Sequence, residues 1–187
     1  MSSIQQILKD ARGAMEKDIA HVKHEFSTVR SGKASPSMLD TVRVEMYGQS
    51  MQLNQVATIN APEPRLITIQ PWDKTQLGTI EKAIQKSDLG LNPTNDGNII
   101  RLVVPALTED RRKELVKVVH KKVEEGRVAV RNVRRDSLEE LRKLQHDKTI
   151  SDDEERRAQE RLQKLTDRYV GEIDKHGHQK EQELLEV

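Results

Sequence analysis

The clearest chemical signal in the sequence lies between residues 111 and 135. Ten residues of this stretch are Lys or Arg and three are acidic, although the whole chain of 187 residues carries a net charge of only +1. On a helix, the spacing of Arg127, Arg131, Arg134 and Arg135 places the four side chains on one face. A guanidinium is a planar fork of donors that fits phosphate oxygens. The spacing therefore predicts an RNA-binding face that contacts phosphates.

The alternative for this face is simple solvation, which holds for most charge runs. Acidic residues are scarce within the stretch, so pairing along the helix cannot neutralise every arginine. The stretch also lacks aromatic residues, on which unpaired bases would stack. Duplex RNA, which is recognised through its shape and backbone, is the better match.

No other group of residues in the sequence predicts a chemical step. His21 and His24 lie three positions apart and His176 and His178 flank Gly177, but neither pair has the cysteine or carboxylate partners of a metal site. The sequence contains no phosphate-binding loop of the Walker type and no glycine-rich dinucleotide motif. We therefore expect no catalytic residue, no metal and no cofactor, and a protein that is not an enzyme.

The composition indicates long helices in a reducing compartment. Charged residues make up 34% of the chain and only four residues are aromatic, which is typical of long helices rather than of a compact globule. No run approaches the roughly 18 apolar residues of a membrane span, and the first residues do not resemble a secretory signal. With no cysteine in the chain, we expect a cytoplasmic protein without a membrane partner.

Three long helices are expected to position the arginine face. Apolar residues recur at steps of three and four from Ser3 to Val29, from Thr108 for about 38 residues, and again after Ser151. Ser151 and Glu154 form a capping box for the third helix, which we expect to fray beyond Gly177. Because no helix could bury its apolar stripe alone, residues 1–30 and 105–187 predict a long antiparallel three-helix bundle.

Residues 31–104 predict a small inserted domain. Strands are expected at residues 42–46, 66–69 and 99–104, with a short helix from Asp73 and turn residues at 91–97. Trp72 is expected to pack in a core or at an interface. The predicted fold class is thus α+β, a long antiparallel three-helix bundle with an inserted small β/α/β domain.

The chain must cross between the two domains twice, near residues 30–34 and 104–106. Two short crossings side by side make a hinge, and domains joined in this way usually move relative to each other. The alternative is a rigid junction held by an apolar interface. The predicted hinge residues are Arg30, Ser31, Gly32, Lys33, Val104 and Pro105.

Four segments of the sequence resemble the signature segments of bacterial ribosome recycling factors. They are VAVRNVRRD at residues 128–136, RSGKASP at 30–36, SDLGLNP at 87–93 and PALTEDRRK at 105–113. Their order and spacing match from end to end, as do the length of the chain and the inserted domain. One departure is Lys33, where the family usually has Arg, so that the charge is kept but a forked contact is weakened.

The resemblance implies an L-shaped molecule that binds the bacterial ribosome after termination, in the intersubunit space. Elongation factor G with GTP then acts on the smaller domain, which separates the ribosomal subunits and frees messenger RNA. In the family, arginines of the signature helix contact large-subunit ribosomal RNA, and these positions correspond to Arg131, Arg134 and Arg135. We expect a monomer.

Two other functions fit part of the sequence. A coiled-coil adaptor would use the same apolar stripes to dimerise, but it gives no reason for an inserted domain. A general duplex-RNA-binding module would use the same arginines, with similar affinity for any duplex and no need for elongation factor G.

Overall fold

The computed structural model describes residues 3–186, which fold into two compact units. The first unit, called the bundle below, joins both ends of the chain, up to Arg30 and again from Glu109 onward. The second, called the small unit, is Ser31–Thr108. The chain thus leaves and re-enters the bundle once, as expected for an inserted domain.

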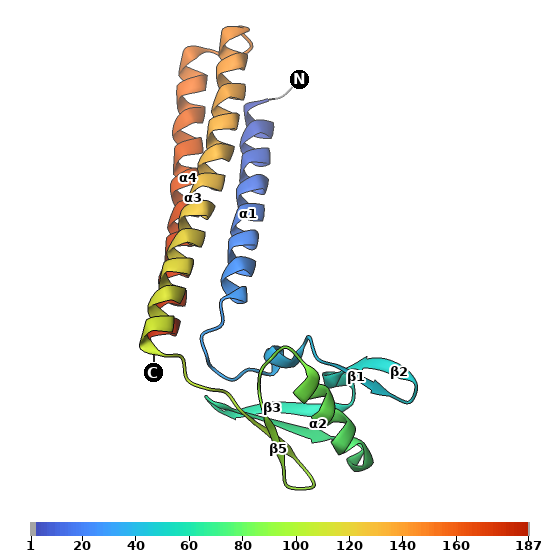
Figure 1. The fold of residues 1–187 in the computed structure, drawn as a ribbon. Helices are drawn as coiled ribbons and strands as arrows, with labels where there is room; N and C mark the ends of the chain where they lie inside the picture. Colours follow the sequence, from blue (N-terminus) through green and yellow to red (C-terminus); the bar gives the residue numbers. More distant parts are fainter. Residues whose placement is uncertain (1–2, 187) are drawn as a thin grey trace. The chain divides into compact units, whose positions relative to one another are not determined.

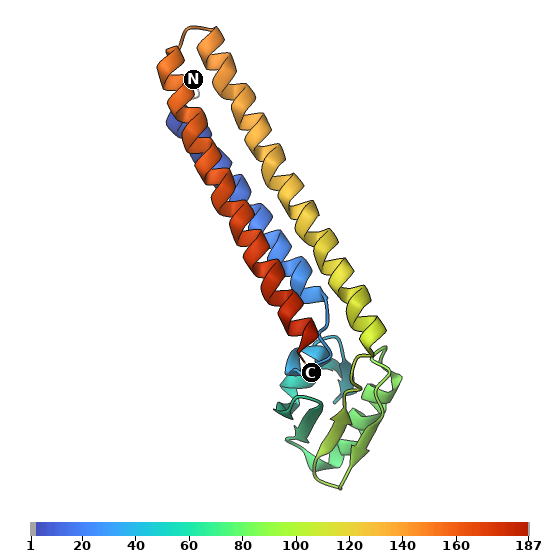
Figure 2. The ribbon, with the colours of Figure 1, turned by 90° about the vertical axis from the view of Figure 1, so that its left-hand side faces the viewer.

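The bundle consists of the three helices α1 (Ile4–Thr28), α3 (Glu109–His146) and α4 (Asp152–Leu185), which lie side by side (Figures 1 and 2). Figure 2 shows α3 and α4 running in opposite directions from the short turn that joins them. Each helix buries one stripe of apolar residues, and Met15, Leu141 and Ile173 are fully buried. The predicted three-helix bundle is confirmed, including the 38-residue length of α3.

The predicted capping box at the start of α4 is also confirmed. The Glu154 amide donates to Ser151 Oγ at 3.1 Å, and the Ser151 amide donates to Glu154 Oε2 at 2.8 Å. These two bonds satisfy amides that the first helical turn leaves without a partner.

The prediction that the third helix frays beyond Gly177 is wrong, because α4 continues to Leu185 and Leu184 is fully buried. Gly177 is itself buried, and a Cβ atom at this position would overlap the side chain of Val123 on α3. The glycine therefore lets two helices approach closely, and it does not end the helix.

The small unit contains a four-stranded antiparallel sheet, a separate hairpin and one helix. The sheet has the order β3-β4-β6-β5, and Ile67 of β4 lies opposite Leu102 of β6. Its buried side chains pack with those of the helix, including Ile80 and Ile84. The elements are β1 (Arg43–Met46), β2 (Gln49–Gln52), β3 (Ala57–Glu63), β4 (Leu66–Pro71), α2 (Leu77–Lys86), β5 (Pro93–Asn95) and β6 (Ile100–Val103).

One prediction for the small unit is wrong, and another holds only in one of its two alternatives. Part of the predicted turn at residues 91–97 is the edge strand β5, where Pro93 is tolerated because an edge strand has one unpaired side. Trp72 is not a core residue, because 66% of its surface is exposed and its indole N–H donates to Thr58 Oγ1 at 2.9 Å. That it packs at an interface stays a prediction.

Candidate nucleic-acid interface

The four arginines of the predicted RNA-binding face all lie on α3, but they differ in how far they are available to a ligand. Arg127 is two-thirds buried, with 34% of its side chain exposed, whereas Arg131 is 56% and Arg135 is 65% exposed. Arg134 is intermediate. The sequence pattern predicts no such difference, since spacing along one helix does not reveal contacts with another helix.

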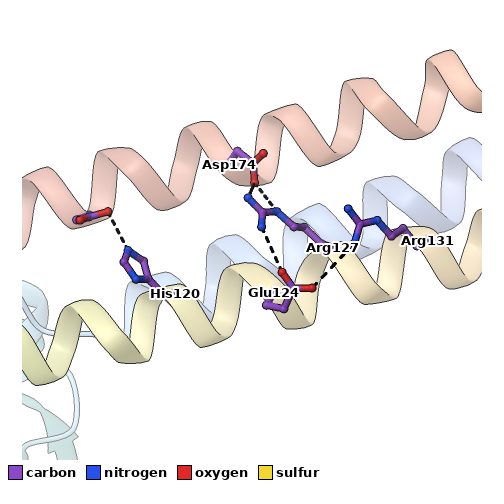
Figure 3. A network of polar contacts seen from close by, with 6 residues as sticks. His120, Glu124, Arg127, Arg131 and Asp174 are labelled. Carbon is purple, nitrogen blue, oxygen red and sulfur yellow. Dashed lines mark hydrogen bonds and ion pairs between the residues drawn. The ribbon is translucent and has the colours of Figure 1, made fainter.

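Arg127 is held in an ion-pair network that joins α3 to α4 (Figure 3). Its Nε donates to Asp174 Oδ1 at 2.7 Å, and its Nη2 lies 2.6 Å from the same oxygen. Its Nη1 also donates to Glu124 Oε2 at 3.2 Å. The hydrogen bonds to Asp174 chiefly raise the pKa of Arg127 above its ordinary value. All three nitrogens of this guanidinium are therefore engaged within the protein.

Arg131 and Arg135 are exposed and have only loose partners. Arg131 Nη1 lies 4.0 Å from Glu124 Oε1 (Figure 3), and Arg135 Nε lies 3.6 Å from the neighbouring Asp136. Because the two arginines are four positions apart, they are neighbours on one helical face. Such a pair can take two phosphates while giving up little within the protein.

Arg134 has a fixed position. Its Nη1 donates to Gln163 Oε1 of α4 at 2.6 Å, and its Nε is buried without a hydrogen-bond partner among the described residues. Gln163 is held in turn by donating to Asp167. The contact with α4 fixes the direction of the guanidinium, so that a phosphate contact would cost less side-chain entropy.

The first predicted hinge segment contains a glycine in the left-handed region of backbone conformation. Gly32 has a φ of +79°, and a Cβ at this position would lie 2.9 Å from Leu107 Cγ. Ser31 is half-buried, whereas Arg30 and Lys33 are exposed. The next residue, Ala34, is fixed to the small unit because its amide donates to Pro64 O at 2.7 Å.

The second predicted hinge segment begins inside the small unit. Val104 is buried and its amide donates to Arg65 O at 2.8 Å, so this residue belongs to the core of the small unit. Pro105 is exposed and is followed by three residues before α3 begins at Glu109. The backbone bonds of Ala34 and Val104 thus fix the chain to the small unit just after the first segment and at the start of the second.

The described part of the chain contains neither a candidate metal site nor a membrane-spanning helix. Among residues 3–186, no cluster of three or more His, Asp or Glu side chains could hold a metal ion. No described helix is both long and apolar enough to cross a membrane.

Comparison with known proteins identifies a family of close relatives. The sequence profile described as "Ribosome recycling factor" matches residues 22–185. The chain is 55% identical to the ribosome-recycling factor of Carboxydothermus hydrogenoformans, over 98% of this chain and 100% of that protein. It is also 55% identical to the ribosome-recycling factor of Bacillus subtilis, over 97% of this chain and 98% of the relative.

Two solved structures have similar folds. One is a solution structure of a ribosome recycling factor, with a TM-score of 0.75, 44% identity and full coverage of both chains. The other comes from models of the T. thermophilus ribosome recycling factor and the E. coli elongation factor G bound to the E. coli post-termination complex. It has a TM-score of 0.63 and 43% identity, and it covers 99% of this chain and 100% of that chain.

Proposed function

Because the chain belongs to the ribosome recycling factor family, we propose that it acts on the bacterial ribosome after termination. Together with elongation factor G and GTP, it promotes dissociation of the ribosome into subunits and release of messenger RNA for a new round of translation. The observation that carries this proposal is that the relatives match nearly the whole chain, through both the bundle and the small unit.

We propose that Arg131, Arg134 and Arg135 contact the phosphates of large-subunit ribosomal RNA. The exposure of Arg131 and Arg135 and the fixed direction of Arg134 support this assignment. Arg127, whose spacing places it on the same face, would act mainly by holding α3 against α4, since Asp174 and Glu124 occupy its guanidinium.

The chain between the two units would let the small unit move when elongation factor G acts on it. Two short segments link the units: α1 ends at Thr28 and Ala34 is fixed to the small unit, and Val104 is fixed to the small unit before α3 begins at Glu109. Gly32 supports a bend here because its positive φ is a conformation that other residues rarely adopt.

In this proposal the protein is not an enzyme, and the energy for splitting comes from the GTP that elongation factor G hydrolyses. Its place of action would be the cytoplasm, where it would work as a monomer. The two alternatives, a general duplex-RNA-binding module and a coiled-coil adaptor, are not favoured, because the family match includes the small unit that neither of them needs.

The test is light scattering of post-termination bacterial ribosomes mixed with this protein, elongation factor G and GTP. We expect scattering to fall only when all three components are present. The Arg131→Ala/Arg134→Ala variant should abolish or strongly slow the fall, since each charged hydrogen bond that is removed costs about 1–3 kcal/mol of binding.

A matched control is the Lys17→Ala/Lys143→Ala variant, which also removes two positive charges from the bundle. Both lysines are exposed, and each follows a fully buried residue, Met15 or Leu141, by two positions, which puts it on the far side of its helix. This variant should split ribosomes like the parent. Splitting that is normal in the folded arginine variant would refute the RNA-contact assignment, and no splitting by the parent would refute the proposed function.

A further inference from the structure

The charges of α4 are sorted onto two sides of the helix. Gln163, Asp167 and Asp174 recur at steps of four and seven and lie on the side toward α3, since Gln163 and Asp174 accept hydrogen bonds from arginines of α3. Four basic residues occupy another side at steps of four, three and four. This set, called the α4 basic stripe, is Arg157, Arg161, Lys164 and Arg168.

One end of the α4 basic stripe, at Arg168, lies near α1. The guanidinium of Arg168 is 5.6 Å from the ring centre of Tyr169, and Tyr169 donates to Glu16 of α1 at 2.9 Å. The pKa of Glu16 is lowered, mainly by the hydrogen bonds from Tyr169 and Arg12 and to a smaller degree by the charge of Arg168. The stripe is therefore about a third of a turn around α4 from the side that meets the α3 arginines.

The side chains of the stripe are available to a ligand. All four residues are exposed. Within the described residues, Arg157, Arg161 and Lys164 have no ion pair or side-chain hydrogen bond, and Arg168 has only a 3.6 Å approach to Glu172. In contrast, Arg127 and Arg134 of α3 are both held by residues of α4.

Simple solvation does not account for this arrangement. A surface that serves only solubility mixes both signs of charge. The segment 147–187 has a net charge of −4, so acidic residues are plentiful on and around α4. Yet between residues 156 and 171 the acidic residues are Glu160 and Asp167, and among the described residues neither forms an ion pair with a member of the stripe.

The spacing of the stripe suits a nucleic-acid backbone. At about 1.5 Å per residue, its members follow one another at about 6, 4.5 and 6 Å along the helix axis. No aromatic residue belongs to the stripe, so it has no platform for stacking bases. We propose that the α4 basic stripe is a second RNA-phosphate site, on a different side of the bundle from the α3 arginines. The bundle would then contact two segments of RNA at once.

The test uses the full-length Arg161→Gln/Lys164→Gln variant and a fluorescein-labelled RNA duplex of about 20 base pairs. Both side chains lack partners among the described residues, so the variant should keep its circular dichroism and melting temperature. We expect anisotropy to show roughly tenfold weaker binding. The slope of log Kd against log salt should fall by about two, since two fewer phosphates are neutralised.

The Lys17→Gln/Lys143→Gln variant is the control for total charge and should bind within about twofold of the parent. Equal losses of affinity in both double variants would mean a general charge effect and would overturn the proposal, as would an unchanged affinity in the stripe variant. The proposal would also be overturned if the stripe variant bound the RNA duplex normally but bound large ribosomal subunits weakly, because the stripe would then recognise an acidic protein.

Combining the stripe variant with Arg131→Gln/Arg134→Gln tests whether the two sites are separate. The stripe substitutions should weaken duplex binding by the same factor in this background, and no further weakening would show a single shared site. RNA binding by the stripe is measured without ribosomes, so this test does not depend on the proposed function. A protein that fails to split ribosomes but keeps stripe-dependent RNA binding would refute ribosome recycling alone.

Discussion

The bundle and the small unit expose different chemistry. The bundle presents charged side chains, and the arginines of α3 are the clearest group among them. The small unit exposes two of the four aromatic residues of the chain, Tyr47 and Trp72, and each is fixed by a hydrogen bond to a neighbouring side chain. Arginines suit phosphates and exposed aromatic residues suit protein partners. This contrast fits a division in which the bundle meets RNA and the small unit meets a protein.

The two units also use glycine for different reasons. In the bundle, Gly126 and Gly177 are buried where a Cβ would overlap a side chain of another helix. In the small unit, Gly32 has a positive φ, so its backbone conformation is what requires glycine. The helices of the bundle thus need glycine because it has no side chain to separate them. The small unit needs glycine because it can adopt a positive φ where the chain changes direction.

The largest effect is expected from truncating one buried isoleucine in each unit, which tests whether the two units have separate cores. Ile67 in the small unit and Ile173 in the bundle are both fully buried, and truncation to Ala should cost about 2–5 kcal/mol in each case. We expect Ile67→Ala to lower hydrogen-exchange protection in residues 31–108 and Ile173→Ala to lower it in the bundle. Equal loss of protection throughout the chain in either variant would contradict two independent cores. The milder Ile→Val changes at the same positions serve as controls.

A smaller effect sharpens the role of glycine in the bundle. A Cβ at Gly126 would lie 2.6 Å from Val22 Cγ2 and 3.2 Å from Ile173 Cδ1, whereas a Cβ at Gly13 meets nothing within 4 Å. Gly126→Ala should therefore destabilise the protein by about 1–3 kcal/mol. Gly13→Ala should stabilise it by up to about 1 kcal/mol through helix propensity alone. Urea denaturation of the two variants measures both changes, and a stabilising Gly126→Ala would show that the helices can move apart without cost.

The contrast between the units also explains how much could be predicted from the sequence. The bundle was predictable because its apolar residues repeat over 25 or more positions, and even the cap at Ser151 follows a local rule. The strands β2, β3 and β5 were missed because they are short or interrupted. Strand β3 contains Pro62 and a shift of register between Asn60 and Glu63, so its pattern of alternation is broken.

The candidate RNA face could be predicted only in part, for a related reason. Spacing placed four arginines on one side of α3, since that depends on a single helix. Which of these arginines form hydrogen bonds within the protein depends on the register between α3 and α4. This register places Asp174 beside Arg127 and Gln163 beside Arg134. Register between helices comes from packing of the whole core, and no local pattern in the sequence encodes it.

The smallest expected effect separates structural from ligand-binding arginines within the bundle. Arg127→Gln breaks the contacts with Asp174 and Glu124 and should cost about 0.5–1 kcal/mol of stability, the upper part of the range for partly exposed ion pairs. Arg131→Gln removes only a 4.0 Å approach to Glu124, so its effect on stability should be smaller still. Under the proposed function, RNA affinity should show the reverse order, because the guanidinium of Arg131 is exposed whereas that of Arg127 is held by Asp174 and Glu124. Denaturant unfolding measures the stability of the two variants, and anisotropy with duplex RNA measures their affinity. If RNA affinity falls as much in Arg127→Gln as in Arg131→Gln, then Arg127 also binds RNA.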